Sequence, residues 1–392
     1  MAVNLTNADN ALKSYYLDAV SAQLDNNTDP FLAAIKKTTE NVWGKDVKKL
    51  AIHGVNGGIG AGTEDGDLPA ARGNRYAQFT ATLKNLYGTI EISDKAIRAS
   101  ENNSGAFVSL LNAEMEGLLE SSSFNLGRML FGDGSGVIGY VSEVANGGIY
   151  LDSVRNFIEG MIVDFRTDDG EAIDGASARE VVEVDRVNNV IKVSGTALTD
   201  EDLEEGYIVT VHGSYQNEIT GLKALFDTSA NSLYGVTRST NPWMNPYIKT
   251  SVGNIKETDI QKALDAVEEN SGNPANMIIT SWGVRRALFN LFSTNKRNID
   301  TLELAGGFKA ISYNGIPVVV DRFCPKNTMY ILNTDDFTLH QLCDWQWLTG
   351  DDGKILRQIP GKPVYSATLV KYAELMCAKP YAQAALMNIV EV

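Results

Sequence analysis

The clearest hydrophobic pattern in the chain lies between Ser104 and Phe131. Apolar residues recur there at spacings of three and four, the period of one helix face, at Phe107, Leu111, Met115, Leu118, Leu126 and Met129. Acidic residues, among them Glu116 and Glu120, occupy the other face. A helix over 104–131 would be roughly 40 Å long at ~1.5 Å per residue. We therefore predict a spine helix that lies across a sheet and packs through these six apolar residues.

Two extended segments with a long polar tip between them precede this helix. The first, KKLAIHGV from Lys48, alternates between apolar and polar residues as a strand does, and the second runs from Tyr76 to about Glu91. The segment between them is rich in glycine and in charged residues. Because an isolated hairpin is marginally stable in water, we predict that the tip rests on another surface, most economically on a neighbouring subunit.

The rest of the chain alternates between strand-rich and helical stretches. Short β-branched segments separated by turn dipeptides over 157–212 predict a small barrel or sandwich inserted into the chain. A helix is predicted over 258–269, with Thr258 and Gln261 as a capping box. A buried strand and a second helix follow, the Asn-Gly pair at 314–315 predicts a tight hairpin turn, and strands dominate towards the C-terminus. This order of elements indicates an α+β protein.

The composition is that of a globular protein large enough for two or three domains, with 392 residues of which 44% are apolar and 21% charged. The net charge of −15 and the lack of a basic patch argue against direct reading of nucleic acid. No run approaches the ~18 apolar residues of a membrane span, and the N-terminus lacks the charged leader and apolar core of a signal peptide. We expect a protein made and kept in the cytosol, or in something assembled there, without a membrane partner.

The motifs that could suggest chemistry are weak. Gly57, Gly58, Gly60 and Gly62 follow a strand, but the acidic, proline-containing segment after them is unsuited to form the helix N-terminus that holds a dinucleotide. The three histidines stand alone on strand-like segments, and the three cysteines are widely spaced, so we expect them to be reduced. No acidic turn matches the ligand spacing of a calcium loop. We predict no catalytic residue, no cofactor and no metal site.

Three stretches carry a resemblance to a known family. LYGTIEISDKAIRAS before the spine helix, FNLGRMLFGDGSG at its end and YNGIPVVVDRFCPKNTMYILNTDDF near the C-terminus resemble the major capsid protein of tailed double-stranded-DNA bacteriophages. The resemblance implies the HK97-like capsid fold, with an N-terminal arm, an extended β-hairpin loop, a long spine helix, peripheral and axial domains and a small β insertion domain. The implied boundaries are 1–47 for the arm, 48–92 for the extension loop, 93–155 for the peripheral domain with the spine helix at 104–131, 156–220 for the insertion domain, 221–255 for a connector, 256–325 for the axial domain and 326–392 for the remaining peripheral strands.

The resemblance also implies a function. It describes a structural protein, not an enzyme, that self-assembles into the pentamers and hexamers of an icosahedral shell around double-stranded DNA, without sequence-specific binding. The shell would be assembled in the host cytoplasm and form the virion capsid, with separate scaffolding, portal and decoration proteins as further partners. We expect intersubunit ion pairs at the loop tip from Glu64, Asp65, Asp67, Arg72 and Arg75. Some family members cross-link a loop lysine, but the tip from Gly54 to Arg75 contains no lysine, so this chemistry is not expected.

Two other interpretations remain open. The same fold could build an encapsulin-like cellular nanocompartment around a cargo enzyme, and a soluble enzyme could carry a site without a recognisable motif. The net charge of −15 suits a container that repels packaged DNA, but many cytosolic proteins share such a charge.

Overall fold

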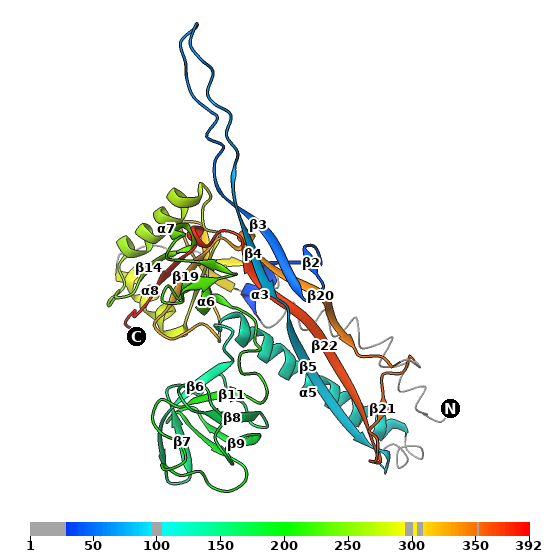
Figure 1. Cartoon of the computed structure of the whole chain (residues 1–392). Coiled ribbons are helices and arrows are strands. Elements are labelled where there is room, and N and C mark those ends of the chain that lie inside the picture. The colour runs from blue at the N-terminus through cyan, green and yellow to red at the C-terminus, as the bar shows by residue number, and fades with distance from the viewer. Residues whose placement is uncertain (1–28, 96–103, 295–300, 304–308, 351–352) are drawn as a thin grey trace.

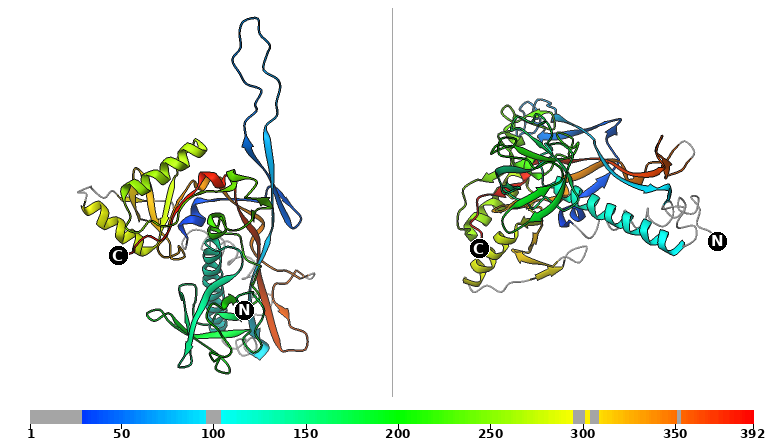
Figure 2. Two further views of the ribbon diagram at one scale, coloured as in Figure 1. Left: turned by 60° about the vertical axis from the view of Figure 1, so that its left-hand side comes forward. Right: turned by 90° about the horizontal axis from the view of Figure 1, so that it is seen from below.

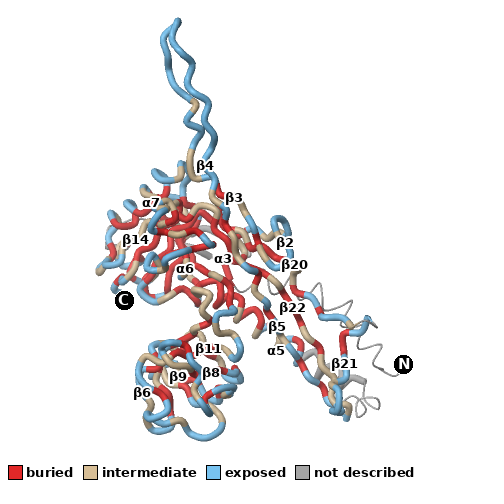
Figure 3. Tube along the Cα trace, viewed as in Figure 1, coloured by how far each residue is buried: buried red, intermediate tan, exposed pale blue. Residues whose placement is uncertain are grey.

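The computed structural model describes residues 29–95, 104–294, 301–303, 309–350 and 353–392. The molecule is elongated, with a long hairpin at one end, a lobe of strands and helices beside the hairpin base, a separate barrel, and a long sheet that runs beside helix α5 (Figure 1). The hairpin also projects clear of the rest of the molecule in the left view of Figure 2. Buried residues concentrate in the lobe, along the long sheet and inside the barrel (Figure 3).

Helices of very different lengths are distributed over these parts. The described α-helices are α3 (Pro30–Ala34), α5 (Ser104–Leu130), α6 (Leu222–Phe226), α7 (Glu257–Ser271) and α8 (Trp282–Thr294). Short 3₁₀ helices are η1 (Pro242–Met244), η2 (Thr334–Asp336) and η3 (Pro380–Ala382). The long α5 follows the helical period of its sequence, with Met115, Leu119 and Leu130 buried and Glu116 and Glu120 exposed.

The long sheet packs against α5. Its strands are β1 (Lys36–Thr38), β20 (Phe337–Trp347), β22 (Val364–Cys377), β21 (Arg357–Gln358) and β5 (Lys84–Ser93). The central strand β22 is antiparallel to both β20 and β5. At Gly88 of β5 the helix comes so close that an added Cβ would lie 2.7 Å from Cδ1 of Leu118. The glycine therefore lets α5 and β5 approach closely.

The lobe contains a second sheet of seven strands. In order these are β14 (Tyr247–Lys249), β23 (Ala384–Leu386), β19 (Met329–Leu332), β15 (Met277–Thr280), β18 (Ile316–Val320), β17 (Lys309–Tyr313) and β16 (Thr301–Glu303). Helices α7 and α8 share a hydrophobic core with it through residues such as Ile260, Val267 and Leu288. The turn between β17 and β18 has positive φ at Asn314 and Gly315, which confirms the predicted tight hairpin.

The remaining strands form the barrel, the hairpin and a small ribbon. The closed barrel has the order β10 (Val190–Val193), β7 (Gly148–Leu151), β6 (Val137–Ala145), β11 (Ile208–Val211), β8 (Ile162–Arg166) and β9 (Arg179–Asp185). The hairpin sheet contains β2 (Val42–Trp43), β3 (Asp46–Gly54) and β4 (Arg75–Thr82), and the ribbon contains β12 (Ser232–Leu233) and β13 (Val236–Thr237).

Several predicted boundaries are wrong because they depended on strand pairing. The barrel begins at Val137, not at 156, since β6 pairs with β11 and β7 pairs with β10. Strands β19 and β23, which we had placed with the peripheral strands of 326–392, belong to the seven-stranded sheet. So does β14, which we had placed in the connector. A strand's own sequence shows its period but not its partner, so local pattern could not assign these strands to sheets.

Two smaller predictions are also wrong. Strand β5 lies within the predicted extension loop of 48–92, yet it pairs with β22 of the long sheet, and the hairpin itself is formed by β3 and β4. Helix α7 begins one residue before Thr258, with Lys256 at the N-cap and no side-chain cap, so Thr258 and Gln261 do not form a capping box. The side chain of Gln261 instead donates to Asp265, one turn further along the helix, and accepts from the side chain of Asn314.

Candidate intersubunit surface

The β3–β4 hairpin carries a tip of about twenty residues, from Val55 to Asn74, that extends away from the molecule (Figures 1 and 2). Its two strands are antiparallel, with Leu50 opposite Gln78 and Ile52 opposite Tyr76. At the apex a turn closes where the amide of Gly66 donates to the carbonyl of Thr63 at 3.2 Å. Almost every residue of the tip is exposed.

The charged residues predicted to make intersubunit contacts all lie on this tip or at its edge. Glu64, Asp65, Asp67, Arg72 and Arg75 are exposed. Within the described part of the chain, none of the five is ion-paired. They do not converge on one point, since the three acidic residues surround the apex and the two arginines lie on the returning arm. Their role between subunits stays a prediction.

Sequence reasoning missed the apolar residues of the same hairpin. Val55, Ile59 and Leu68 are 81%, 80% and 90% exposed on the tip. Leu50 and Ile52 are exposed on one face of β3, where they alternate with the buried Val47 and Ala51 of the other face. This alternation was visible in the sequence, but it could not show which face the protein covers. Several exposed apolar side chains on one segment are typical of a surface that contacts a partner.

Stacked rings hold the base of the hairpin. The ring of His53 on β3 stacks on Trp243 of η1 at 4.6 Å between centroids, and Phe79 on β4 stacks on the same indole at 6.0 Å. Phe79 also contacts Tyr234, whose carbonyl accepts from the amide of Thr80 at 2.9 Å. The hairpin is therefore anchored to the segment between the barrel and the lobe. Trp243 lies in the segment 221–255, which the sequence predicted to be a connector.

The predicted packing residues of the spine lie along α5. Met115, Leu126 and Met129 are buried, and Leu118 is half-buried against β5. The side chains of Phe107 and Leu111 lie outside the described residues.

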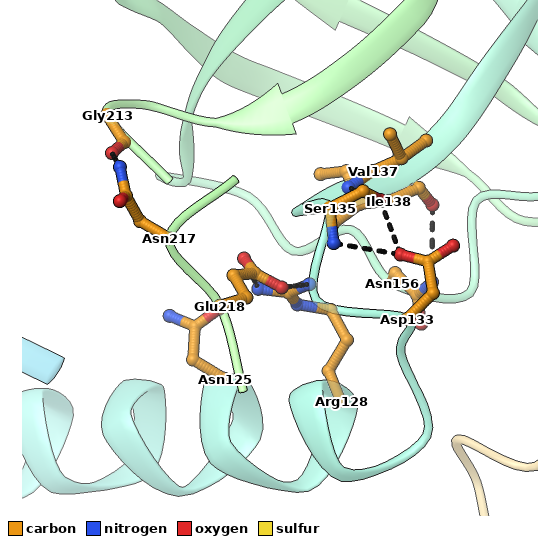
Figure 4. Close-up of polar contacts among 10 residues, drawn as sticks. All are labelled: Asn125, Arg128, Asp133, Ser135, Val137, Ile138, Asn156, Gly213, Asn217 and Glu218. Carbon is orange, nitrogen blue, oxygen red and sulfur yellow. Dashed lines mark hydrogen bonds and ion pairs between the residues drawn. The ribbon is translucent and has the colours of Figure 1, made fainter. Parts of the chain in front are cut away.

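The chain crosses between α5 and the barrel at one compact junction (Figure 4). Arg128, in the last turn of α5, donates to both carboxylate oxygens of Glu218, at 2.8 Å from Nη1 and 2.6 Å from Nη2. The side chains are 4% and 3% exposed. Asp133 accepts from the amide of Ser135 where the chain enters the barrel, and Asn217 donates to the carbonyl of Gly213 where it leaves. The amide of Gln216 donates to the carbonyl of Ser135 at 2.8 Å and so joins the two connecting segments beside the helix end.

A pair of buried carboxyl groups lies on another face of α5. Asp29 accepts from the amides of Phe31 and Leu32 at the start of α3, and Asp321 accepts from the amide of Phe323 after β18. Burial and the neighbouring Asp321 raise the pKa of Asp29 well above its usual value, and burial raises the pKa of Asp321 to about 6. Oδ2 of each carboxyl group is buried and makes no hydrogen bond within the described residues, and burial together with the nearby Asp321 favours the protonated form of Asp29.

The negative charge of the chain is concentrated in the barrel. Between Val137 and Gly213 the sequence holds 16 acidic and 5 basic residues, which accounts for −11 of the net −15. Two of the basic residues are ion-paired with barrel carboxylates, Arg186 with Glu159 and Lys192 with Glu183. The other 315 residues of the chain carry −4.

The described residues contain no group of three or more His, Cys, Asp and Glu side chains that could hold a metal ion. None of the helices in the described part is long and apolar enough to cross a membrane.

Comparison with known proteins gives one family match. Residues 207–352 match the family model described as SU10 major capsid protein. No curated protein matches the sequence. Among solved structures, the cyanophage A-1(L) capsid asymmetric unit has a similar fold, with a TM-score of 0.56 and 14% identity over 93% of each chain.

Weaker similarities extend to a virus and to a cellular compartment. The structure titled Mycobacterium phage Bobi gives a TM-score of 0.46 and 9% identity over 100% of both chains. The holo-SrpI encapsulin complex from Synechococcus elongatus PCC 7942 gives 0.44 and 12% identity over 95% of both chains. These two do not decide between the alternatives. The α+β fold class predicted from the sequence is confirmed.

Proposed function

We propose that this chain is a structural major capsid protein with the HK97-like fold of tailed bacteriophages. The shell closes when the β3–β4 hairpin of each copy lies on a neighbouring copy. The protein belongs to the virion capsid and acts as part of an oligomeric shell. The observation that carries the proposal is the tip of the hairpin, where Val55, Ile59 and Leu68 are almost fully exposed to solvent in the single chain. Covering them is favourable at about 25 cal/mol per Å² of apolar surface.

The shell is built from pentamers and hexamers and encloses double-stranded DNA without reading its sequence. A container for DNA benefits from a surface that does not bind phosphate, and the chain carries 49 acidic against 34 basic residues. Because most of the excess charge lies in the barrel, we propose that the barrel is on the outer side of the shell. The surface towards DNA is then nearly neutral, which lets DNA pack closely without being held.

The protein has a structural role and no catalytic activity in this proposal. Its partners are further copies of itself, together with separate scaffolding, portal and decoration proteins. The tip residues Glu64, Asp65, Asp67, Arg72 and Arg75 make ion pairs with a neighbouring copy, which fix its register more than they add affinity.

The test is removal of Ala61 to Ala71, the outer part of the tip. This segment is exposed and contributes no strand to any sheet of the described residues, so the subunit keeps its fold. We expect circular dichroism and thermal unfolding to match the wild type, and electron microscopy to show no closed shells. A control variant changes an exposed position of the barrel instead, Val187→Gly, and should still give shells. Normal particles from the tip deletion would contradict the proposal.

A further inference from the structure

The dipeptide Asn-Gly occurs three times in the chain, at 56–57, 146–147 and 314–315. An asparagine side chain is most open to attack by its own backbone when glycine follows, because glycine has no Cβ to shield its amide nitrogen. Attack of that nitrogen on Cγ closes a five-membered ring and expels the side-chain nitrogen as ammonia. The backbone must be free to turn the glycine amide towards Cγ, so the fold determines which of the three sites can react.

Two of the three dipeptides are held in tight hairpin turns. The residues 146–147 connect β6 to β7 and the residues 314–315 connect β17 to β18, and all four have positive φ. Strand pairing continues directly on both sides of each turn. The side-chain amide of Asn314 also donates to Oε1 of Gln261 at 3.0 Å. Ring closure at either turn would therefore require the end of a hairpin to open first.

Asn56 lies in a different backbone setting. It follows β3, whose last pair is Gly54 with Arg75, and both Asn56 and Gly57 are exposed. Within the described residues, neither of the two has positive φ and neither makes a backbone-to-backbone hydrogen bond. The amide nitrogen of Gly57 can therefore turn towards Cγ of Asn56 without breaking a strand pair.

Two neighbouring groups favour attack on Asn56. The amide of Gly58 donates to Oδ1 of Asn56 at 2.9 Å. Negative charge develops on this oxygen when the nitrogen of Gly57 adds to Cγ, and a donor that is already in place stabilises that charge. Arg72 lies across the hairpin, where a Cβ added at Gly57 would be 3.7 Å from Cγ of the arginine. This arginine has no ion-pair partner within the described residues, so its positive charge is available to the reacting group.

We propose that Asn56 is a site of spontaneous deamidation, with Arg72 stabilising the negative charge that develops. The nitrogen of Gly57, after losing its proton to hydroxide, forms a bond to Cγ of Asn56. The bond from Cγ to Nδ2 breaks, and Nδ2 takes a proton from water and leaves as ammonia. A water molecule then opens the ring at one of its two carbonyl groups. Opening at Cγ gives aspartate, and opening at the main-chain carbonyl gives isoaspartate.

The inference goes beyond the proposed function and does not rest on it, because the reaction takes place within one unassembled chain. Either product places a new negative charge on the hairpin arm that faces Arg72. Isoaspartate also adds one carbon atom to the backbone between Val55 and Ile59, two of the exposed apolar residues of the tip. The reaction therefore changes both the charge and the shape of the hairpin tip.

Mass spectrometry of the whole chain tests the assignment. The unassembled wild-type subunit is incubated in a mildly alkaline buffer made with water enriched in heavy oxygen, and peptides from the three sites are compared over time. Each conversion takes up one oxygen atom from this water, which distinguishes it from deamidation during later handling. We expect Asn56 to convert roughly tenfold faster or more than Asn146 and Asn314, because the two turns must first open locally. In urea the three sites should convert at similar rates.

Single substitutions at the tip provide a second readout. Asn56→Gln should suppress the reaction, since the longer side chain would have to close a six-membered ring. Arg72→Gln should slow the conversion of Asn56 by about threefold, as expected for an exposed charge. Arg75→Gln is the matched control, because Arg75 is equally exposed but lies beside Gly54, and it should leave the rate unchanged.

The outcomes that would overturn the inference are distinct from those that concern shell assembly. Equal conversion at the three sites of the folded chain, or no conversion of Asn56 in it, would overturn the assignment of the site. Equal rates in the two arginine variants would overturn the role of Arg72. Neither result would bear on the tip deletion, which measures whether shells form.

Discussion

Arg128 and Glu218 form a bidentate ion pair that is almost completely buried at the end of the spine helix. The two residues are 90 positions apart, with the whole barrel between them. Their contact closes the loop that contains the barrel and fixes where the chain returns to the body of the subunit. A buried pair of this kind is costly to break, because the remaining partner stays charged and unpaired.

Glu218→Gln should therefore lower the free energy of unfolding of the unassembled subunit by about 3–5 kcal/mol. Replacing both partners by apolar residues of similar size, Arg128→Met with Glu218→Leu, should recover most of that loss, since no charge is left buried. Urea denaturation followed by tryptophan fluorescence measures both. Equal destabilisation in the single and double variants would mean that the pair is not what matters at this junction.

The two glycines of α5 should respond in opposite ways to the same substitution. An added Cβ at Gly127 would lie 2.6 Å from the buried ring of Phe323, whereas at Gly117 nothing lies within 4 Å. We expect Gly127→Ala to lower the free energy of unfolding by about 1–3 kcal/mol through overpacking. Gly117→Ala should raise it by about 0.5–1 kcal/mol, because alanine is the better helix former. Thermal unfolding of the two variants distinguishes the effects, and a change of the same sign in both would contradict the observed packing.

The buried carboxyl pair should make stability depend on pH. The pKa of Asp29 is raised on folding, so the folded state holds a proton that the unfolded state releases above about pH 4. The resulting stability is complete under acidic conditions and is lost as the pH rises through the folded pKa values, including that of Asp321 at about 6. Arg155 and Arg322 lie close enough to oppose this shift in part by favouring the charged form of Asp321.

Asn at position 29 tests this pH dependence. Asp29→Asn keeps the oxygen that accepts from Phe31 and Leu32 and supplies a permanent donor towards Asp321. Between about pH 4 and 8, the wild type should lose stability relative to the variant, because the pKa of Asp29 is raised by burial and by the neighbouring Asp321. Glu374, buried with its pKa raised to about 7, acts in the same direction in both proteins and cancels in the difference. Parallel profiles would show that folding does not raise the pKa of Asp29.

The stacked rings at the base of the hairpin should control its rigidity. Trp243→Ala removes the surface on which both His53 and Phe79 stack. Aromatic pairs contribute about 0.5–1.5 kcal/mol each beyond their buried area, so amide exchange along β3 and β4 should accelerate roughly tenfold or more. Trp282→Ala is the control, because this half-exposed tryptophan lies on α8 and contacts Arg285 instead. Unchanged exchange in the first variant would place the anchor elsewhere.

The local hydrophobic pattern was enough to predict most helices and strands, but not which strands pair with one another. The period of 104–131 predicted α5, the Asn-Gly pair predicted the turn at 314–315, and the β-branched segments predicted a barrel or sandwich. The arrangement of strands in the sheets could not be predicted in the same way. Strands β5, β14, β19 and β23 pair with strands far away in the sequence, and the sequence of one strand does not indicate its partner.

The candidate surface shows the same division. The exposed hairpin tip followed from its glycine and charge content, which no folded core could use. Its stacked anchor at Trp243 did not follow, because that contact joins segments about 190 residues apart. Ion pairs such as Arg128 with Glu218 could not be predicted either, because the sequence around an arginine on a predicted helix does not indicate which carboxylate will pair with it.

The measurement that tests the central claim most directly is an electron cryomicroscopy map of the assembled particle, at a resolution that traces the chain. The account predicts a closed shell in which density for residues 55–74 of each copy lies against a neighbouring copy and covers Val55, Ile59 and Leu68. A closed shell whose hairpins stand free in solvent would contradict it, and so would failure of the chain to assemble with or without a scaffolding protein.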